Sequence, residues 1–281
     1  MTIKSGVIGY PIKHSLSPKI HDFFLKKHNI IGSYEKIEIP KENFETEINK
    51  LIDSGYKGFN VTIPHKEEIF KKCNFVSKSA FLTKAVNTIV ITEDKKLFGH
   101  NSDADGFIDN LKYSINDFTF TGKKSFVIGA GGAARAIIYG LIKSGIKEIF
   151  VTNRTQERVE KIIKDFSIYC EENNSKITFL SKRDFESQLN ECDLLVNSTS
   201  LGMDGQDNLD INIKNLKETS VVYDIVYKPL LTKLLKTSQD KGHKIITGIG
   251  MLVFQALIGF ELWYKEKPEE KHLRELFKIL I

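Results

Sequence analysis

Short apolar runs alternate with amphipathic segments along most of the chain, and this alternation predicts strands and helices in turn. In the first half, strands are predicted at 5–9, 34–39, 58–63, 86–92 and 96–99, and helices at 17–25, at 41–53 and directly after Pro64. Ser17 is predicted to be the N-cap of its helix, with Pro18 at the first helical position. The first half is therefore predicted to be an α/β unit whose strand ends meet along one rim.

The second half alternates strand and helix more regularly. Strands are predicted at 124–128, 148–152, 193–197, 221–225 and 244–247, and helices at 133–144, with Gly145 as its C-cap, and at 156–166. Strict alternation predicts a parallel, doubly wound sheet with right-handed crossovers. The chain is expected to end in two amphipathic helices, at 251–263 and 269–280.

Composition narrows the function classes. With 281 residues, the chain is long enough for two domains, and its charged content of 27% is ordinary for a globular protein. No apolar run approaches the roughly 18 residues that span a bilayer, and no signal-peptide pattern opens the sequence, so we expect a cytoplasmic protein. Three distant cysteines predict neither a disulfide framework nor a metal site.

The net charge of +5 comes from lysines spread along the chain rather than from a dense basic cluster. This distribution argues against a nucleic-acid partner and favours a small-molecule one, since a mild positive bias suits an anionic ligand. The sequence leaves open whether the chain forms a homodimer.

A glycine-rich segment at 129–134 carries the clearest chemical signal. It reads G-x-G-x-x-A between a predicted strand and a predicted helix. The first glycine permits a tight turn, the second lets the backbone approach a pyrophosphate, and the small third residue lets helix and strand pack closely. The helix N-terminus then offers free N–H groups to phosphates. This context favours a dinucleotide site over a plain turn.

The next strand ends in Asn153, Arg154 and Thr155, with Arg158 one helical turn further on. Enzymes that use NAD usually place a carboxylate at this strand end to bind the ribose 2′-hydroxyl. None is present, and a guanidinium suits a 2′-phosphate instead. The pattern therefore favours NADP over NAD, although Thr155 could also serve as a helix cap and both arginines could simply be surface residues.

Polar side chains gather at the predicted strand ends of the first half. They are Ser15 and Ser17, then Asn60 and Thr62 on one strand face with Lys66 at the following turn, then Asn87, and finally Asp103. Three of these residues also have a plainer interpretation: Ser17 and Asp103 could be helix caps, and Lys66 could be a surface residue. Ligands of α/β sheets bind at such strand ends.

Taken together, these residues resemble the pattern of shikimate dehydrogenases over nearly the whole chain. The matching segments, in order, are S-L-S-P at 15–18, N-V-T-I-P-H-K at 60–66, A-V-N-T at 85–88, N-S-D at 101–103, G-A-G-G-A-A-R at 129–135, N-R-T at 153–155, N-S-T-S-L-G-M at 197–203, D-I-V-Y-K-P-L at 224–230 and G-I-G-M-L-V-F-Q at 248–255.

The resemblance implies a fold and a reaction. It implies a substrate-binding catalytic domain at 1–103, completed by C-terminal helices at 250–281, and a Rossmann-type NADP-binding domain at 104–249. It also implies reversible, NADPH-dependent reduction of 3-dehydroshikimate to shikimate, on the pathway to chorismate and the aromatic amino acids.

Site residues carry over by position. Lys66 and Asp103 match the family's catalytic pair. The substrate-binding set is Ser15, Ser17, Asn60, Thr62, Asn87, Tyr227 and Gln255. The cofactor-binding set is Gly129, Ala130, Gly131, Gly132, Ala133, Asn153, Arg154, Thr155, Arg158, Ile225 and Gly248.

Two departures from the family pattern concern local geometry. Ser102 stands where threonine is more usual, and Lys84 stands where glycine is common. Two alternatives remain: an NAD-preferring quinate/shikimate dehydrogenase, and a non-catalytic ligand-sensing module on the same fold. The missing carboxylate after the 148–152 strand argues against the first, and the presence of both Lys66 and Asp103 argues against the second.

Overall fold

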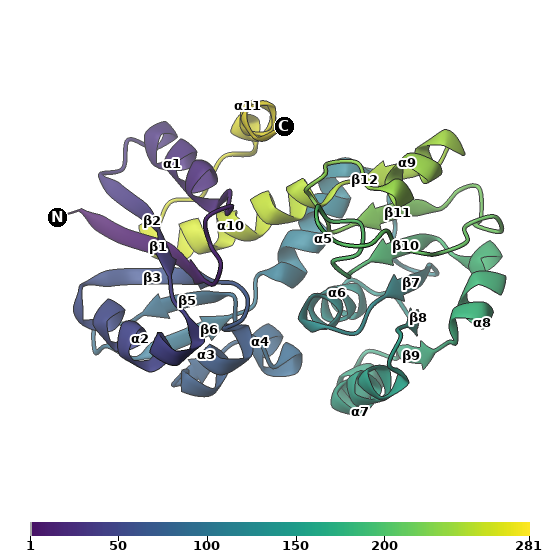
Figure 1. Cartoon of the computed structure of the whole chain (residues 1–281), viewed down its shortest axis with the longest axis horizontal. Coiled ribbons are helices and arrows are strands. Elements are labelled where there is room, and N and C mark those ends of the chain that lie inside the picture. The colour runs from purple at the N-terminus through teal and green to yellow at the C-terminus, as the bar shows by residue number, and fades with distance from the viewer. Residues whose placement is uncertain (1) are drawn as a thin grey trace. The chain divides into compact units, whose positions relative to one another are not determined.

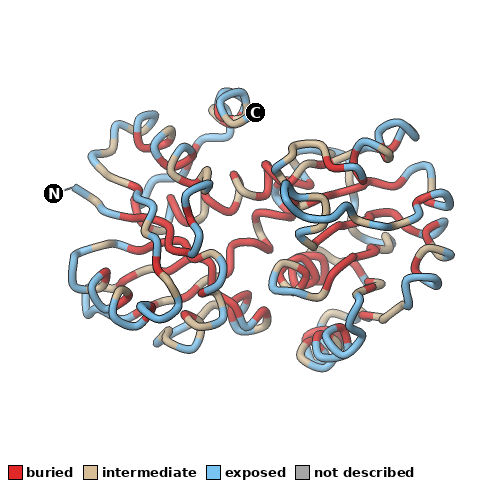
Figure 2. The backbone as a smooth tube through the Cα atoms, in the orientation of Figure 1, coloured by how far each residue is buried: buried red, intermediate tan, exposed pale blue. Residues whose placement is uncertain are grey.

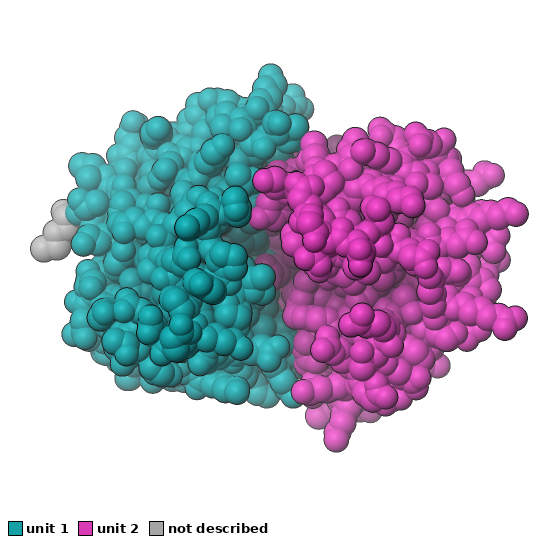
Figure 3. All heavy atoms as spheres, viewed as in Figure 1, with its two compact units in different colours: residues 1–102, 252–281 teal, residues 103–251 magenta. Residues whose placement is uncertain are grey.

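The computed structural model describes residues 2–281, which divide into two compact units. The first unit comprises the chain through Ser102 together with Leu252–Ile281, and the second comprises Asp103–Met251 (Figure 3). Within the described residues, each unit holds one six-stranded sheet. The predicted fold class, α/β with a doubly wound second half and C-terminal helices that return to the first unit, is confirmed.

The sheet of the first unit is mixed, with strand order β2-β1-β3-β5-β6-β4. Its strands are β1 (Ile3–Gly9), β2 (Gly32–Glu38), β3 (Tyr56–Val61), β4 (Phe75–Val76), β5 (Thr88–Ile91) and β6 (Leu97–His100). β1 pairs in parallel with β2 and β3, whereas β5 is antiparallel to both β3 and β6. The carboxyl ends of β1, β3 and β6 therefore share one edge with the start of β5 (Figure 1).

Helices and short 3₁₀ turns complete the first unit. They are α1 (Ser17–Lys27), η1 (Lys41–Asn43), α2 (Phe44–Asp53), α3 (Lys66–Lys72), α4 (Lys78–Thr83), the part of α10 (Gly248–Tyr264) from Leu252 onward, η3 (Glu270–His272) and α11 (Leu273–Leu280). The core contains Ile8, Phe44, Phe59 and Ile69, which are fully or almost fully buried. The buried stretches of the backbone are drawn in red in Figure 2. The apolar runs that predicted β1 and β3 are thus the runs that line this core.

The prediction that Ser17 caps α1 is wrong by one residue. Leu16 occupies the N-cap position, and Ser17 is the first helical residue. The Ser17 side chain makes no capping bond because Ser17 is already inside the helix, and Ser15 Oγ accepts from the Ser17 N–H at 3.3 Å. Pro18 still lies in the first turn, where its missing N–H breaks no helical bond.

The sheet of the second unit is entirely parallel, with strand order β12-β11-β10-β7-β8-β9. Its strands are β7 (Lys124–Ile128), β8 (Glu148–Thr152), β9 (Lys176–Phe179), β10 (Leu194–Asn197), β11 (Val221–Asp224) and β12 (Lys244–Ile246). From β7, the chain adds β8 and β9 on one side of the sheet and then β10, β11 and β12 on the other. The place where the direction of strand addition reverses, between β7 and β10, is the switch point at which doubly wound sheets bind nucleotides.

The helices of the second unit connect these strands. They are α5 (Asp103–Ser114), α6 (Gly132–Lys143), α7 (Gln156–Glu172), α8 (Lys182–Ser187), η2 (Leu189–Glu191) and α9 (Lys233–Asp240), with the start of α10. Ser144, rather than the predicted Gly145, is the C-cap of α6. Gly145 follows it with φ +101°, and the N–H of Ile146 reaches back to the Leu141 carbonyl at 3.0 Å, so the glycine closes the helix from the next position.

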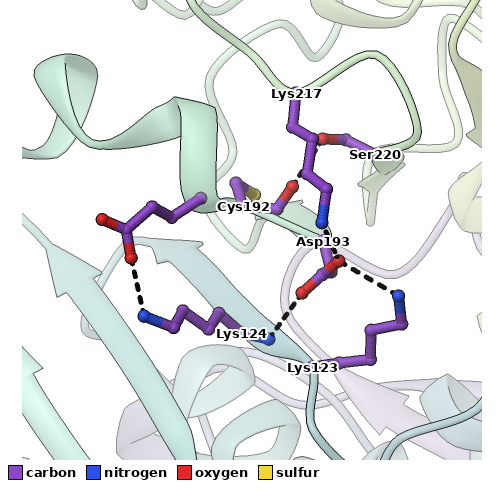
Figure 4. Close-up of polar contacts among 7 residues, drawn as sticks. Lys123, Lys124, Cys192, Asp193, Lys217 and Ser220 are labelled. Atoms are coloured by element: carbon purple, nitrogen blue, oxygen red, sulfur yellow. Dashed lines mark hydrogen bonds and ion pairs between the residues drawn. The ribbon is translucent and has the colours of Figure 1, made fainter.

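A buried carboxylate clamps the amino ends of β7 and β10 (Figure 4). Asp193 accepts from Lys217 Nζ at 2.7 Å, from Lys123 Nζ at 3.1 Å and from the Lys124 N–H at 2.9 Å. Burial opposes ionisation of Asp193, but these donors outweigh it and hold the pKa of the carboxyl below its ordinary value.

Within residues 2–281, no helix is both long enough and apolar enough to cross a membrane.

Candidate active site

In the first unit, predicted site residues gather at the shared strand edge. Asn60, near the end of β3, lies opposite Thr88 at the start of β5, and Thr88 lies opposite His100 at the end of β6. Asn87 directly precedes β5, and Ser102 follows β6 after one residue. The side chains of Asn60, Asn87 and Ser102 are buried at this edge.

Asn87 is the centre of this polar cluster. Its Oδ1 accepts from the Ser102 N–H at 2.8 Å, from Ser102 Oγ at 3.1 Å and from Thr88 Oγ1 at 3.0 Å. Its Nδ2 donates to Gln255 Oε1 at 3.5 Å. Gln255 comes from α10, 168 residues further along the chain. The structure therefore brings Asn87 and Gln255 together, as a shared substrate site requires.

Asn60 contacts a residue that the sequence did not single out. The Tyr34 hydroxyl donates to Asn60 Oδ1 at 2.7 Å. Burial raises the pKa of Tyr34, and the Ser17 side chain opposes this rise. Both amide hydrogens of Asn60 are used within the protein, since Nδ2 donates to the Asn87 carbonyl and to Thr88 Oγ1, each at 3.1 Å.

Lys66 is the first residue of α3 and is half-buried. The preceding His65 is fully buried, its ring stacked on Phe44 and its Nε2 2.6 Å from the Ile39 carbonyl. The Lys66 carbonyl accepts from the Val86 N–H at 2.9 Å. The backbone at Lys66 is thus held next to the A-V-N-T segment, and the residue before it is fixed by packing.

The remaining predicted residues of the first half lie on segments that follow these strands. Thr62 is half-buried just beyond the end of β3, and Ser15 is half-buried before α1. Asp103 is the first residue of α5, in the second unit, and is buried. It directly follows Ser102, and a helix N-terminus favours a carboxylate in its first turn.

The glycine-rich loop of the second unit joins β7 to α6. Gly129 has φ +111°, and a Cβ there would lie 2.6 Å from Ser198 Oγ, so the fold itself requires glycine at this position. Gly131 and Gly132 are different: apart from its chain neighbours and the backbone of α6, a Cβ on either would meet no atom of residues 2–281 within 4 Å. The fold leaves open space beside these two glycines, where the backbone N–H groups of α6 begin. That space is where the sequence pattern places a pyrophosphate.

The segment after β8 carries two exposed arginines, Arg154 and Arg158. In the described chain, neither guanidinium is ion-paired, in contrast to Arg135, which lies 2.8 Å from Asp165. Asn153 Nδ2 donates to the Thr155 carbonyl at 2.9 Å and so shapes the turn that presents Arg154. Thr155 occupies the N-cap position of α7 without a side-chain capping bond.

Ile225 and Gly248 meet beside the carboxyl end of β11. A Cβ on Gly248 would lie 2.0 Å from the Ile225 carbonyl oxygen, and the Gly248 N–H donates to the Val226 carbonyl at 3.3 Å. Tyr227 follows on the same loop and is half-buried, and this burial raises the pKa of its phenol. A tyrosine of this kind remains a neutral hydrogen-bond donor at neutral pH.

The second unit holds a doubly wound sheet with open space at its glycine-rich loop, and the strand ends of the first unit carry amides, hydroxyls and a lysine. These features together define a dinucleotide-dependent enzyme for a small polar substrate. The chain belongs to the shikimate dehydrogenase family. Residues 7–89 match the family model described as the shikimate dehydrogenase substrate binding domain, and residues 111–225 match the model described as shikimate / quinate 5-dehydrogenase. The family resemblance predicted from the sequence is confirmed.

Similar proteins cover almost the full chain. A shikimate dehydrogenase (NADP(+)) of Paramagnetospirillum magneticum is 40% identical over 265 residues, which is 94% of this chain and 94% of that one. The crystal structure of a Thermus thermophilus shikimate 5-dehydrogenase in complex with NADP(H) and shikimate has a TM-score of 0.87 and 31% identity, covering 100% of each chain. A shikimate dehydrogenase crystallised with NADP+ has a TM-score of 0.89 and 34% identity, covering 100% of this chain and 96% of that one.

Sequence reasoning missed residues that only the three-dimensional arrangement connects. Tyr34 and Thr88 join the predicted site residues of the first unit, and Asn197 and Asp224 join two loops of the second. Asn197, Asp224 and Thr88 all lie within segments that carried the family resemblance. Tyr34 lies in the middle of a strand, where its pattern indicates only core packing.

Proposed function

We propose that this chain catalyses the reversible NADP-dependent conversion of 3-dehydroshikimate to shikimate, a step of the shikimate pathway. The observation that carries the proposal is that one chain combines a glycine-rich loop with open space beside Gly131 and a buried cluster in which Asn87, Ser102 and Gln255 meet. Two relatives that match 94% of this chain are each named shikimate dehydrogenase (NADP(+)).

NADP fits the residues present. Gly131 and Gly132 leave room for the pyrophosphate, and the N–H groups at the start of α6 would hold it. Arg154 and Arg158 would hold the 2′-phosphate, since a planar guanidinium binds a phosphate through paired hydrogen bonds. Ile225 and Gly248 would lie at the nicotinamide end, and Gly129, Ala130, Ala133, Asn153 and Thr155 would complete the cofactor site.

The substrate would be held by neutral donors and acceptors. Ser15, Ser17, Thr62, Asn87, Tyr227 and Gln255 would bind its carboxylate and ring hydroxyls, with Asn60 as part of the same set. Buried amides and hydroxyls of this kind discriminate strongly against a compound that lacks the matching hydroxyl, because the protein groups are then left without partners.

Lys66 and Asp103 would carry the proton transfer. When bound, the nicotinamide ring supplies the hydride in one direction and accepts it in the other. In the reductive direction, the Lys66 ammonium would stabilise the negative charge that develops on the carbonyl oxygen and donate the proton that makes it a hydroxyl. Asp103 would orient the Lys66 ammonium and compensate its charge.

An NAD-preferring quinate/shikimate dehydrogenase is the nearest alternative, and it is not favoured. Asn153 stands at the strand end where such an enzyme is expected to carry a carboxylate. It is followed by Arg154 and Arg158, neither of which is ion-paired within residues 2–281.

The direct test of the function mixes purified chain with shikimate and NADP and follows absorbance in the nicotinamide band. We expect steady formation of NADPH that depends on shikimate. A chain that binds shikimate without forming NADPH would instead be a ligand-sensing module, and this outcome would contradict the proposal.

A cytoplasmic setting is also proposed, because Cys73, Cys170 and Cys192 are all free thiols, as is usual in a reducing compartment. The sequence leaves open whether the chain forms a homodimer, and sedimentation of the purified chain decides this question.

A further inference from the structure

Tyr34 connects the predicted substrate residues although no sequence motif contains it. It lies in β2 and is 5% exposed. Its hydroxyl donates to Asn60 Oδ1 at 2.7 Å, so it links β2 to the end of β3. Burial raises the pKa of Tyr34, and the Ser17 side chain at the start of α1 opposes this rise.

Aromatic neighbours hold the Tyr34 ring in place. His21 of α1 stacks on it, with ring centroids 3.8 Å apart and planes 7° apart, and Trp263 of α10 lies with its centroid at 6.0 Å. Trp263 is itself fixed, since its Nε1 donates to the Ile89 carbonyl at 2.8 Å. Burial lowers the pKa of His21 to about 3, so the stack involves an uncharged imidazole at neutral pH. The Tyr34 hydroxyl therefore has a single defined position.

An asparagine amide can exchange its oxygen and nitrogen by a half-turn at little steric cost, so only its hydrogen bonds decide which way it points. The Tyr34 hydroxyl proton requires the Asn60 oxygen. This leaves Asn60 Nδ2 to donate to Thr88 Oγ1 at 3.1 Å. Thr88 Oγ1 then donates its own proton to Asn87 Oδ1 at 3.0 Å.

This series of hydrogen bonds, from Tyr34 through Asn60 and Thr88, ends at Asn87 in the polar cluster described above. With Asn87 Oδ1 occupied by the Thr88 and Ser102 donors, Asn87 Nδ2 must face outward to Gln255 Oε1, at 3.5 Å. Each hydrogen bond from Tyr34 to Asn87 thus helps to orient the next group, together with two backbone groups: the Asn87 carbonyl, which accepts from Asn60 Nδ2, and the Ser102 N–H, which donates to Asn87 Oδ1. Such networks act as a unit, and the loss of one member affects the others.

We propose that Tyr34 is a positioning residue for the substrate: its hydroxyl sets the orientation of Asn60 and, through Thr88, contributes to that of Asn87 and Gln255. This inference rests on the proposed function. It assigns to Tyr34 the role of fixing which donors and acceptors meet the substrate, without contact between Tyr34 and the reacting atoms.

Tyr34→Phe tests the proposal, because it removes the hydroxyl and keeps the ring stacked on His21. We expect the KM for shikimate to rise about tenfold and kcat to fall, while the KM for NADP stays within about twofold of the parent value. The matched control is Tyr264→Phe, another buried tyrosine of the same unit, whose hydroxyl contacts Ser5 and the Ser33 carbonyl. We expect it to lose similar thermal stability but to keep the parent KM for shikimate.

Thr88→Val interrupts this series of hydrogen bonds at Thr88 and supplies a second variant if Tyr34→Phe does not fold. It should show the same selective rise in the KM for shikimate. Parent-like constants in Tyr34→Phe or in Thr88→Val, or an equal defect in Tyr264→Phe, would overturn the positioning role. The parent chain is assayed first, so an inactive parent would count against the proposed function, whereas an active parent with an unaffected Tyr34→Phe would count against Tyr34 alone.

Discussion

Asn197 donates a hydrogen bond of 2.9 Å from its Nδ2 to Oδ1 of Asp224, and so links the carboxyl ends of two neighbouring parallel strands. Asp224 is fully buried, and burial raises the pKa of its carboxyl against the pull of its donors. The same carboxylate accepts from the Val226 N–H at 3.0 Å and from Thr232 Oγ1 at 2.7 Å. It therefore fixes the loop that carries Ile225, which is predicted to lie at the nicotinamide end.

Replacement of Asp224 by alanine should destabilise the second unit by about 3 kcal/mol, because three buried donors lose their acceptor at once. The measurement is urea unfolding followed by circular dichroism. Asp210→Ala is the matched control, since Asp210 is 94% exposed and pairs only with Lys182 among the described residues. Its effect should stay within about 0.5 kcal/mol. Equal effects of the two substitutions would contradict the role given to Asp224.

Asp193→Asn should weaken stability at neutral pH and flatten its dependence on acid. The folded-state pKa of Asp193 lies below its ordinary value, so this carboxylate stabilises the fold above the unfolded-state pKa. That contribution disappears as the pH falls through the folded-state pKa. We expect a loss of about 1–3 kcal/mol at pH 7 and little difference between variant and parent at strongly acid pH. A loss of the same size at all pH values would point to packing rather than to charge.

Lys84→Gly should stabilise the protein. Lys84 caps α4 with φ 54° and ψ 31°, a left-handed conformation that costs a side-chain-bearing residue about 1 kcal/mol and costs glycine nothing. The urea midpoint of Lys84→Gly should therefore rise. The same change at Lys71, in the last turn of α3, should lower the free energy of unfolding by up to about 1 kcal/mol, because glycine is unfavourable within a helix. A lower midpoint for Lys84→Gly would show that contacts of the lysine side chain outweigh the backbone strain.

Lys66→Ala should lower kcat by roughly 10²–10⁴-fold and leave the KM for shikimate within a few-fold of the parent value, as expected for a group that acts on the transition state. Lys71→Ala, on the exposed side of the same helix, serves as the control and should keep the parent kcat. A near-normal kcat in Lys66→Ala would remove the lysine from the proposed chemistry.

Local sequence patterns located the parts of the fold that are long and regular. β7 and β8 have the predicted bounds, because each is an apolar run between clear turn signals. β9 and α8 were missed, since a four-residue strand and a six-residue helix give too short a pattern to recognise. Helix α7 runs to Glu172 rather than Phe166, because no glycine or proline marks an earlier end.

The candidate site was predictable only as far as its residues stand in recognisable motifs. Asn87 and Gln255 could be named by resemblance, but their hydrogen bond depends on how α10 returns to the first unit. Tyr34 could not be found in this way, because its role comes from its hydrogen bond to Asn60, which is distant in the sequence. Such contacts are a property of tertiary packing rather than of any local pattern.

The most direct test of the central claim is the kcat/KM for cofactor in shikimate oxidation, measured with NADP and with NAD on the parent chain, on Arg154→Ala and on the exposed-arginine control Arg183→Ala. The parent and the control should prefer NADP by about 10- to 100-fold, because one or two charge-assisted hydrogen bonds to the 2′-phosphate contribute that much. Arg154→Ala should lose most of this preference, while its kcat/KM with NAD stays unchanged. No turnover of shikimate with either cofactor, or a parent that prefers NAD, would contradict the assignment.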